Sequence, residues 1–265
     1  MGGKSDRVSP PGDPLRGRYV FLAVDENPDY RLLAPITMKF YERIGWTPIV
    51  MFVVASTGNP YPTSTVAQCS RLFCGALPFA DNDWVLTGDI DMIPIDAKYF
   101  RGGESANAVS FYSNWAGGRR ISMTFKARAK TWRKLMQINP SDQVEKTTHQ
   151  FLVNNLGASF SYGQAWTLDE SALTQVTLKN RDLVNFLIRD EVRPTQAARR
   201  IDRVDWNLDQ PDGVIDIHCM RKPFSDENWP SLLAAIRIAS PDMLDWVREY
   251  GEGVRSEQSA CLRVP

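Results

Sequence analysis

The chain of 265 residues has no net charge, only two histidines and no long apolar run. Its 31 basic and 31 acidic residues cancel, which argues against the positive field of a general nucleic-acid binder. No apolar segment approaches the roughly 20 residues that a membrane span needs, and the amino terminus lacks the apolar core of a signal peptide. We therefore expect a cytoplasmic protein with no nucleic-acid partner and no membrane span in this chain. A trimmed Golgi-type enzyme or a viral enzyme is the alternative.

Cysteine is also scarce, with four residues at Cys69, Cys74, Cys219 and Cys261. None of them forms a Cys-x-x-Cys pair, so neither a zinc knuckle nor a redox motif is indicated. We expect reduced and mostly buried thiols. No Asn-x-Ser/Thr sequon with a permitted middle residue occurs, which leans weakly toward a protein that is not secreted.

The composition that is present fits one globular domain. A hydrophobic content of 43% in a chain of this length can bury one sizeable core. Residues 1–17 are polar and rich in proline and glycine, and we predict a flexible leader there. We assign residues 18–250 to a single catalytic domain and residues 251–265 to a tail.

Buried strands and amphipathic helices alternate along the first third of the chain. Continuous apolar runs predict strands at 19–24, 49–55 and 84–87, and helical spacing predicts helices at 30–44 and 62–77. Strand, helix and strand form the opening of a Rossmann-like βαβ unit. The sequence therefore predicts an α/β fold with a mostly parallel sheet flanked by helices.

Weaker patterns extend this prediction through the rest of the chain. They predict strands at 108–112, 121–125 and 214–217, and helices at 127–138, 142–156, 181–191 and 230–250. A basic loop is expected around Arg199, Arg200 and Arg203.

The most informative segment follows the strand at 84–87, where Asp89 and Asp91 are separated by one residue. In open α/β sheets, ligands bind outside the carboxyl ends of the strands, and Gly88 would let a ligand approach closely. Two carboxylates suit a hard cation whose remaining positions are filled by phosphate oxygens and water. The pair predicts a metal-bound diphosphate; the alternative is a solvated corner where aspartates cap a turn.

His218 stands at the end of the apolar strand at 214–217. An imidazole added to two carboxylates would favour Mn²⁺ over Mg²⁺. Arg221 and Lys222 follow closely, and their charges could neutralise a departing diphosphate. The alternative is a packed or surface histidine, which is the role we expect for His149.

A second acidic pair, Asp169 and Glu170, precedes a short apolar helix. These residues are either the cap and first-turn acid of that helix, or acids that face the reacting carbon or the acceptor hydroxyl. Trp166 just upstream could form a wall on which a sugar stacks.

With these residues in view, the chain resembles glycosyltransferases of the GT-A fold. Over residues 18–224 it is similar to the family 8 retaining enzymes, which include glycogenin and bacterial lipopolysaccharide galactosyltransferases, as a divergent relative. The segment from Phe21 to Tyr30 resembles the family's first strand, which holds the nucleoside; this implies contacts from Val24, Asp25, Asn27 and Tyr30. Ser70-Arg71-Leu72 resembles the family's Ala-Arg-Leu, whose arginine contacts the nucleotide sugar.

Three further segments carry the resemblance. Asp89-Ile90-Asp91 is similar to the metal-binding DXD motif, which implies that Asp89 and Ile90 also contact the donor. His218 to Pro223 resembles a terminal His...Lys-Pro-Trp segment, which implies a site for Mn²⁺ (or Mg²⁺) made by Asp89, Asp91 and His218, with Lys222 on the diphosphate. Here the lysine comes two residues early and Phe224 replaces the tryptophan. Asp169 to Thr174 resembles Asp-Gln-x-x-Leu-Asn beside the donor sugar, with Glu170 in place of the glutamine.

The resemblance implies an enzyme that moves a sugar from a nucleotide-diphosphate donor, foremost a UDP-sugar, to a hydroxyl of a carbohydrate or glycoconjugate acceptor. Retention of configuration is expected ahead of inversion. Asp169 or Glu170 would either steady an oxocarbenium-like centre or deprotonate the acceptor. One rival is a sugar-nucleotide nucleotidyltransferase, which would need a glycine-rich basic loop where residues 25–28 are acidic. The other is a non-catalytic carbohydrate-binding protein with the same fold.

Overall fold

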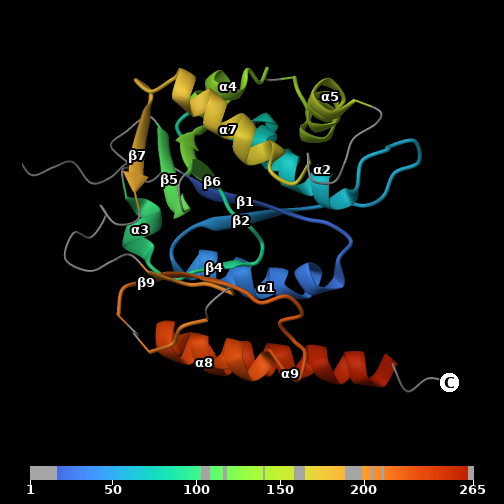
Figure 1. Cartoon of the computed structure of the whole chain (residues 1–265), viewed down its shortest axis with the longest axis vertical. Coiled ribbons are helices and arrows are strands. Elements are labelled where there is room, and N and C mark those ends of the chain that lie inside the picture. Colours follow the sequence, from blue (N-terminus) through green and yellow to red (C-terminus); the bar gives the residue numbers. More distant parts are fainter. Residues whose placement is uncertain are drawn as a thin grey trace, which may run out of the picture.

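The structure of the chain is a computed structural model, which describes residues 17–102, 108–115, 118–139, 141–157, 165–188, 199–203, 206–209 and 212–261. The predicted flexible leader lies almost wholly outside the described residues. Two sheets and a set of packed helices make up the described part (Figure 1).

The larger sheet has six strands in the order β2-β1-β3-β6-β5-β7. Their bounds are β1 Arg18–Val24, β2 Thr47–Phe52, β3 Trp84–Thr87, β5 Ala108–Trp115, β6 Gly118–Arg128 and β7 Val184–Ile188. The pairs β1/β2, β1/β3 and β5/β7 are parallel, whereas β6 is antiparallel to both of its neighbours. The predicted α/β class with a mostly parallel sheet is confirmed.

A second, three-stranded sheet has the order β4-β9-β8, with β4 Met92–Pro94, β9 Val214–His218 and β8 Arg199–Ile201. The chain leaves the large sheet at the end of β3 and enters the small sheet at β4. Residues 88–91 are therefore the link between the two sheets.

The helices form layers on either side of the large sheet (Figure 1). Their bounds are α1 Pro28–Arg43, α2 Thr63–Ser70, η1 Arg71–Ala76, α3 Ala97–Arg101, α4 Ala129–Met136, α5 Val144–Leu156, α7 Leu168–Lys179, α8 Trp229–Ala239, η2 Pro241–Met243 and α9 Leu244–Cys261. In Figure 1, α2, α4, α5 and α7 lie above the large sheet, and α1 lies below it. The pair α8 and α9 forms an outer layer beyond α1.

Helix α1 is buried on two faces. Asn27 caps its start by accepting a hydrogen bond of 3.0 Å from the Asp29 N–H, and Gly45, with φ of 84°, follows its end as predicted. One face of α1 joins the core under the large sheet, and the other joins a core shared with β4, β9, α8 and α9; the residues involved are Ala34, Tyr41 and Ile44 on the first face, and Leu33, Ile36 and Phe40 on the second. Helix α1 is thus the common layer between the two sheets.

The predicted helix at 181–191 is wrong, because residues 184–188 form β7, which pairs in parallel with β5. The run of apolar side chains there fits helical spacing as well as a buried strand, and the open edge of β5 decides between them. The expected basic loop around Arg199 is likewise wrong at its start, where β8 pairs with β9.

The predicted helix at 230–250 is broken in two. Helix α8 ends at Ala239, and Ser240 adopts a non-helical conformation before Pro241, which cannot continue a helix. Helix α9 then runs on to Cys261, so the residues assigned to a tail are helical as far as that position.

Two composition-based expectations can be compared with the structure. Cys69, Cys74 and Cys219 are free and buried, as predicted. Among the helices of the described residues, none has the length and apolar character required to cross a membrane.

Candidate active site

The candidate site begins at the carboxyl ends of the neighbouring strands β1 and β3. Strand β1 has β2 on one side and β3 on the other, and all three run parallel, so the carboxyl ends of β1 and β3 flank the point where the winding of the sheet reverses direction. Ligands of open α/β sheets bind outside the carboxyl ends of the strands at such a point. Asp25 and Asn27 follow β1, and Asp89 follows β3.

The residues after β1 build a turn into α1. The Val24 side chain is buried, and its carbonyl accepts a hydrogen bond of 2.7 Å from the Val53 N–H. The Asp25 carboxylate accepts one of 3.0 Å from the Asn27 N–H, and Asn27 caps the helix. Tyr30 lies in the first turn of α1. Burial and the nearby Asp91 raise the pKa of Tyr30, while Arg203 and Arg221 oppose the rise.

A first network of charges centres on Arg71, the residue that joins α2 to η1. Its guanidinium is buried and donates to Asp89, and from its other arm to Asp169 over 2.8 Å. Burial alone would lower the pKa of Arg71, but the carboxylates of Asp89 and Asp169 outweigh it and raise the pKa. The structure thus brings three of the predicted residues together from the start of η1, the end of β3 and the start of α7.

The two acids at the start of α7 have different surroundings. Asp169 is buried, and besides Arg71 its carboxylate accepts a hydrogen bond of 2.8 Å from the Glu170 N–H. Burial raises the pKa of the Asp169 carboxyl, and Arg71 opposes the rise. Glu170 is half-buried, and Trp166 just before the helix is 43% exposed. An exposed aromatic surface next to these acids can stack with a sugar ring.

A second network centres on Asp91, on the side of the small sheet. One of its carboxylate oxygens lies 3.0 Å from Nη1 of Arg203 and 3.5 Å from Nε2 of His218. Burial would raise the pKa of Asp91, but His218 and then Arg203 lower it below its ordinary value. Correspondingly, burial would lower the pKa of His218, and Asp91 raises it.

The second network contains two of the three predicted metal ligands, Asp91 and His218. Nδ1 of His218 lies 3.3 Å from a carboxylate oxygen of Asp202, which directs Nε2 toward Asp91; a carboxylate behind an imidazole is the usual way to orient a metal-binding histidine. Asp89, the third predicted ligand, faces Arg71 instead. Consequently, within the described ranges, no group of three or more His, Cys, Asp and Glu side chains is arranged to hold a cation.

Two residues next to the acids, Gly88 and Ile90, are packed against helix α1. The Thr37 hydroxyl of α1 donates a hydrogen bond of 2.6 Å to the carbonyl of Ile90, whose side chain is buried. A Cβ on Gly88 would lie 2.4 Å from the Tyr41 hydroxyl oxygen. The expectation that Gly88 leaves room for a ligand therefore needs correction: the glycine makes room for Tyr41.

The segment after β9 is exposed at its basic residues. Arg221 and Lys222 are both exposed, and Lys222 has φ of 52°, with its carbonyl accepting from the Ser225 N–H over 3.0 Å. His149 on α5 makes an edge-on ring contact with Tyr61, with centroids 6.0 Å apart. That contact agrees with the structural role expected for His149.

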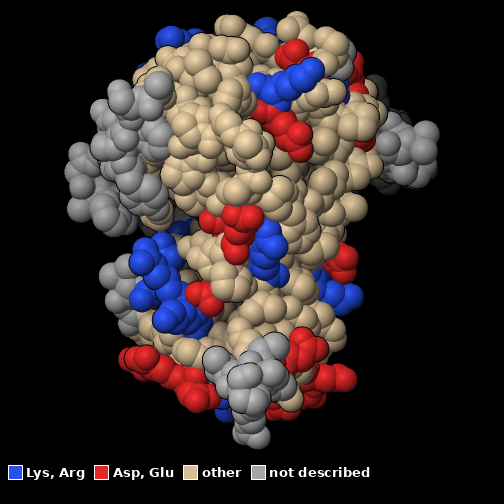
Figure 2. Space-filling view, turned by 90° about the vertical axis from the view of Figure 1, so that its right-hand side faces the viewer, with Lys and Arg blue, Asp and Glu red and all other residues tan. Residues whose placement is uncertain are grey.

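Sequence reasoning gave no role to four charged residues in or just after the strands of the small sheet. Arg203 contacts Asp91, and Asp202 contacts His218. Arg200 forms a two-point ion pair with the buried Asp216 at 2.7 and 3.0 Å. The one signal in the sequence was the density of arginines at 199–203. In Figure 2, acidic and basic side chains lie next to one another across the middle of the face shown.

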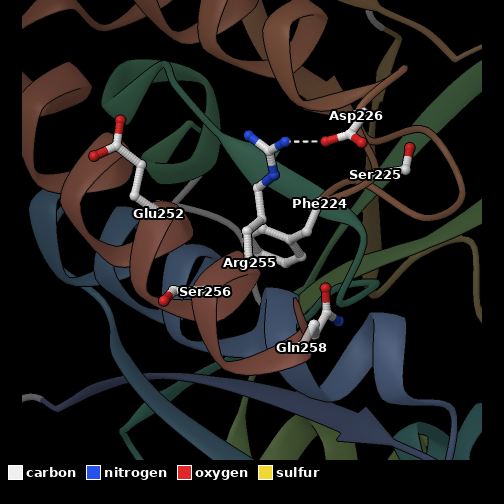
Figure 3. A pocket seen from close by; sticks show the side chains of 7 residues that line it. All are labelled: Phe224, Ser225, Asp226, Glu252, Arg255, Ser256 and Gln258. Carbon is white, nitrogen blue, oxygen red and sulfur yellow. Dashed lines mark hydrogen bonds and ion pairs between the residues drawn. The ribbon is translucent and has the colours of Figure 1, made fainter. Parts of the chain in front are cut away.

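A hollow of about 540 Å³ lies elsewhere, between the turn at Phe224 and helix α9 (Figure 3). It is lined by Phe224, Ser225, Asp226, Glu252, Arg255, Ser256 and Gln258, and Arg255 forms an ion pair with Asp226 across it. None of the candidate acids lines this hollow. The chemistry therefore points to the strand ends at Asp89 and Asp91 rather than to this open depression.

No protein-family model and no curated protein matches the chain. Among solved structures, it is similar to the glycosyltransferase GlyE of Streptococcus pneumoniae TIGR4, with 14% identity over 89% of this chain and 64% of GlyE and a TM-score of 0.48. The apo form of GlyE gives 12% identity, 88% and 64% coverage and a TM-score of 0.48. A glycosyltransferase involved in glycosylation of the major capsid of PBCV-1 gives 12% identity, 76% and 92% coverage and a TM-score of 0.41. The chain spans less than two thirds of the length of GlyE.

Proposed function

We propose that the chain is a metal-dependent glycosyltransferase, which moves a sugar from a nucleoside-diphosphate donor, foremost a UDP-sugar, to a hydroxyl of a carbohydrate or glycoconjugate. The observation that carries the proposal is the position of Asp89 and Asp91. Both follow β3 where it lies beside β1, and they form ion pairs with Arg71 and Arg203 respectively. Acidic and basic side chains gathered at the carboxyl ends of these strands suit a ligand that carries a diphosphate.

Asp91 and His218 would hold the divalent cation, Mn²⁺ or Mg²⁺, and Asp89 would join them once it leaves Arg71. A bound cation would supply positive charge to the diphosphate as the leaving group departs. Asp202 keeps the His218 ring oriented through Nδ1. Asp25, Asn27 and Tyr30, which follow β1, would contact the nucleoside, along with the backbone at Val24 and Ile90.

Arg71 and Lys222 would provide the protein's own charges for the diphosphate. Arg71 is held in place by Asp169 from α7, so its guanidinium is oriented before the donor arrives. Lys222 is exposed and has the freedom to close over a bound ligand. Cations placed in advance around a departing anion stabilise the transition state without reorganisation during the reaction.

In the transfer itself, the bond between the sugar's C1 and the diphosphate oxygen breaks, and the nucleoside diphosphate keeps the electron pair. The acceptor oxygen forms the new bond to C1 and passes its proton to the departing diphosphate oxygen. Asp169 is buried and committed to Arg71 and the Glu170 N–H, so we assign it to positioning Arg71. Glu170, half-buried beside Trp166, is the carboxylate that we place at the sugar, where it steadies positive charge on C1. This assignment goes with retention of configuration.

The experiment is a screen of UDP-, GDP- and dTDP-sugars, each with Mn²⁺ and with EDTA, in which thermal stabilisation and nucleotide release are both measured. Metal-dependent stabilisation by one donor, with release of its nucleotide, is the expected result and names the sugar. NMR of the product's anomeric proton then tests retention. A full panel without any metal-dependent response would overturn the proposal in favour of a non-catalytic binding protein.

The structure offers one observation against the nucleotidyltransferase rival. The segment after β1 is an acidic turn capped by Asn27, so the N–H groups at the start of α1 are partly used by the protein itself. A triphosphate would need free N–H donors and basic side chains at that place.

A further inference from the structure

Asp91 forms an ion pair with Arg203. Nη1 of Arg203 lies 3.0 Å from Oδ2 of Asp91, and the same oxygen is the one that faces Nε2 of His218. The Asp91 side chain is 12% exposed and that of Arg203 26% exposed. The guanidinium therefore sits on the carboxylate oxygen that the proposed function gives to a divalent cation.

Arg203 differs from the neighbouring Arg200 in how firmly it is held. Arg200 is more deeply buried and bonds Asp216 through two nitrogens, so it belongs to the framework of the small sheet. Arg203 lies beyond the end of β8, and it reaches Asp91 with one nitrogen. Besides Asp91, the Arg203 side chain has a hydrogen bond with Tyr30, and neither contact belongs to a strand. Arg203 is thus a cation that can leave its partner without breaking the sheet.

Two positive charges cannot share one carboxylate oxygen at low cost, because a guanidinium and a metal ion at this distance repel each other strongly in a partly buried site. When Asp91 binds a cation, Arg203 has to find another anion. The diphosphate of the donor brings that anion to the same place, and a guanidinium binds phosphate oxygens through several donors at once.

We propose that Arg203 is an exchangeable counter-ion, which neutralises Asp91 in the empty site and moves to the donor's diphosphate when Asp91 binds a divalent cation. This inference rests on the proposed function. The ion pair between Arg203 and Asp91 competes with the cation for Asp91 and with the diphosphate for Arg203. Binding of either ligand removes this competition for the other ligand, so the two bind cooperatively. An empty site is also spared an unpaired buried carboxylate, which would destabilise the fold.

The test separates the two ligands. Mn²⁺ binding to the protein without nucleotide is followed from the electron paramagnetic resonance of free Mn²⁺, and UDP, GDP and dTDP are titrated calorimetrically with and without Mn²⁺. Arg203→Gln should bind Mn²⁺ alone about fivefold more tightly than the unmodified chain, and should bind the preferred nucleotide in the presence of Mn²⁺ about tenfold more weakly. Opposite signs for the two ligands are the signature of the exchange.

Two further variants make the result specific. Arg248→Gln removes a positive charge from α9, where Arg248 pairs with the exposed Asp245, and should leave both affinities unchanged. Arg203→Lys keeps the charge, so its Mn²⁺ affinity should stay close to that of the unmodified chain, while its nucleotide affinity falls because the guanidinium's several donors are lost. Thermal unfolding of each variant checks that it is folded.

An unchanged or weakened Mn²⁺ affinity in Arg203→Gln would overturn the inference, and so would an unchanged nucleotide affinity. The proposed function fails in a different way, when the unmodified chain binds none of the three nucleotides with or without Mn²⁺. In that case the Mn²⁺ titration still reports whether Arg203 competes for Asp91.

Discussion

Arg71 donates a hydrogen bond of 2.8 Å to Asp169, a residue 98 positions away in the chain, and both side chains are buried. Because the guanidinium also reaches Asp89, this pair fixes the start of α7 against the end of β3. The pair belongs to the fold and to the candidate site at once.

Asp169→Asn should destabilise the protein by about 3 kcal/mol, because it removes one partner of a buried ion pair. The matched control is Glu170→Gln on the neighbouring, half-buried side chain, for which we expect a change below about 0.5 kcal/mol in stability but a clear loss of transfer. Urea unfolding measures the first effect and donor turnover the second. Equal destabilisation by the two variants would contradict the separate roles given to these acids.

Gly88→Ala should destabilise the protein by about 2 kcal/mol through overpacking, since the added Cβ would lie 2.4 Å from the Tyr41 hydroxyl oxygen. Tyr41→Phe removes that oxygen, so the double variant should recover much of the loss. A double-mutant cycle of unfolding free energies measures the coupling. Additive effects would indicate that Tyr41 does not limit the size of residue 88.

Asp91→Asn should lower donor turnover by about a thousandfold while the protein still folds, because the carboxylate that faces both His218 and Arg203 is lost. The measurement is nucleotide release from the preferred donor at saturating Mn²⁺. Asp226→Asn, on the rim of the hollow beside α9, serves as the control and should keep its activity. Near-normal turnover in Asp91→Asn would disprove the metal assignment.

The ion pair between Arg43 and Asp242 should give a small, pH-dependent contribution to stability. Two hydrogen bonds of 2.8 and 3.0 Å from Arg43 lower the pKa of Asp242. A pKa that is lower in the folded state means that the contribution is present above the unfolded pKa and is lost as the pH falls through the folded one, below about pH 4.

We expect the pair to contribute about 0.5 kcal/mol at neutral pH, because Asp242 is well exposed and salt screens the interaction. The free energy of unfolding of Asp242→Asn, compared with that of the unmodified chain at several pH values, measures this. The difference should shrink toward zero in acid and in high salt. A difference that grows in acid would show that the sign is wrong.

The sequence predicted the elements that depend on local patterns. Strands β1, β2 and β3 are continuous apolar runs, and α1 has both helical spacing and a stop at Gly45, so neighbouring residues alone determine them. Strand β7 was mistaken for a helix because its apolar run fits both periods, and only its pairing with β5 decides. The break at Ser240 and Pro241 carried a local signal, and the helical spacing on both sides of it hid that signal.

The residues of the candidate site also differ in how far the sequence could reveal them. Asp89, Asp91 and His218 could be found because they stand at or just after the ends of buried strands, and Asp169 because it precedes a helix. Arg71 was found only from the resemblance to a family. Arg203 could not be found, because its contact with Asp91 spans 112 residues and depends on β8 pairing with β9. No spacing rule within the chain connects these two residues.

Helix α1 is buried on two faces, so it connects the outer helices α8 and α9 to the link that carries Asp89 and Asp91. The Thr37 hydroxyl on α1 donates a hydrogen bond to the carbonyl of Ile90, which lies between the two acids in the sequence. The opposite face of α1 packs against α8 and α9. A shift of α8 and α9 would therefore be transmitted through α1 to the Ile90 peptide group. Changes in how α8 and α9 pack on α1 can in this way move Ile90, the residue that joins Asp89 to Asp91.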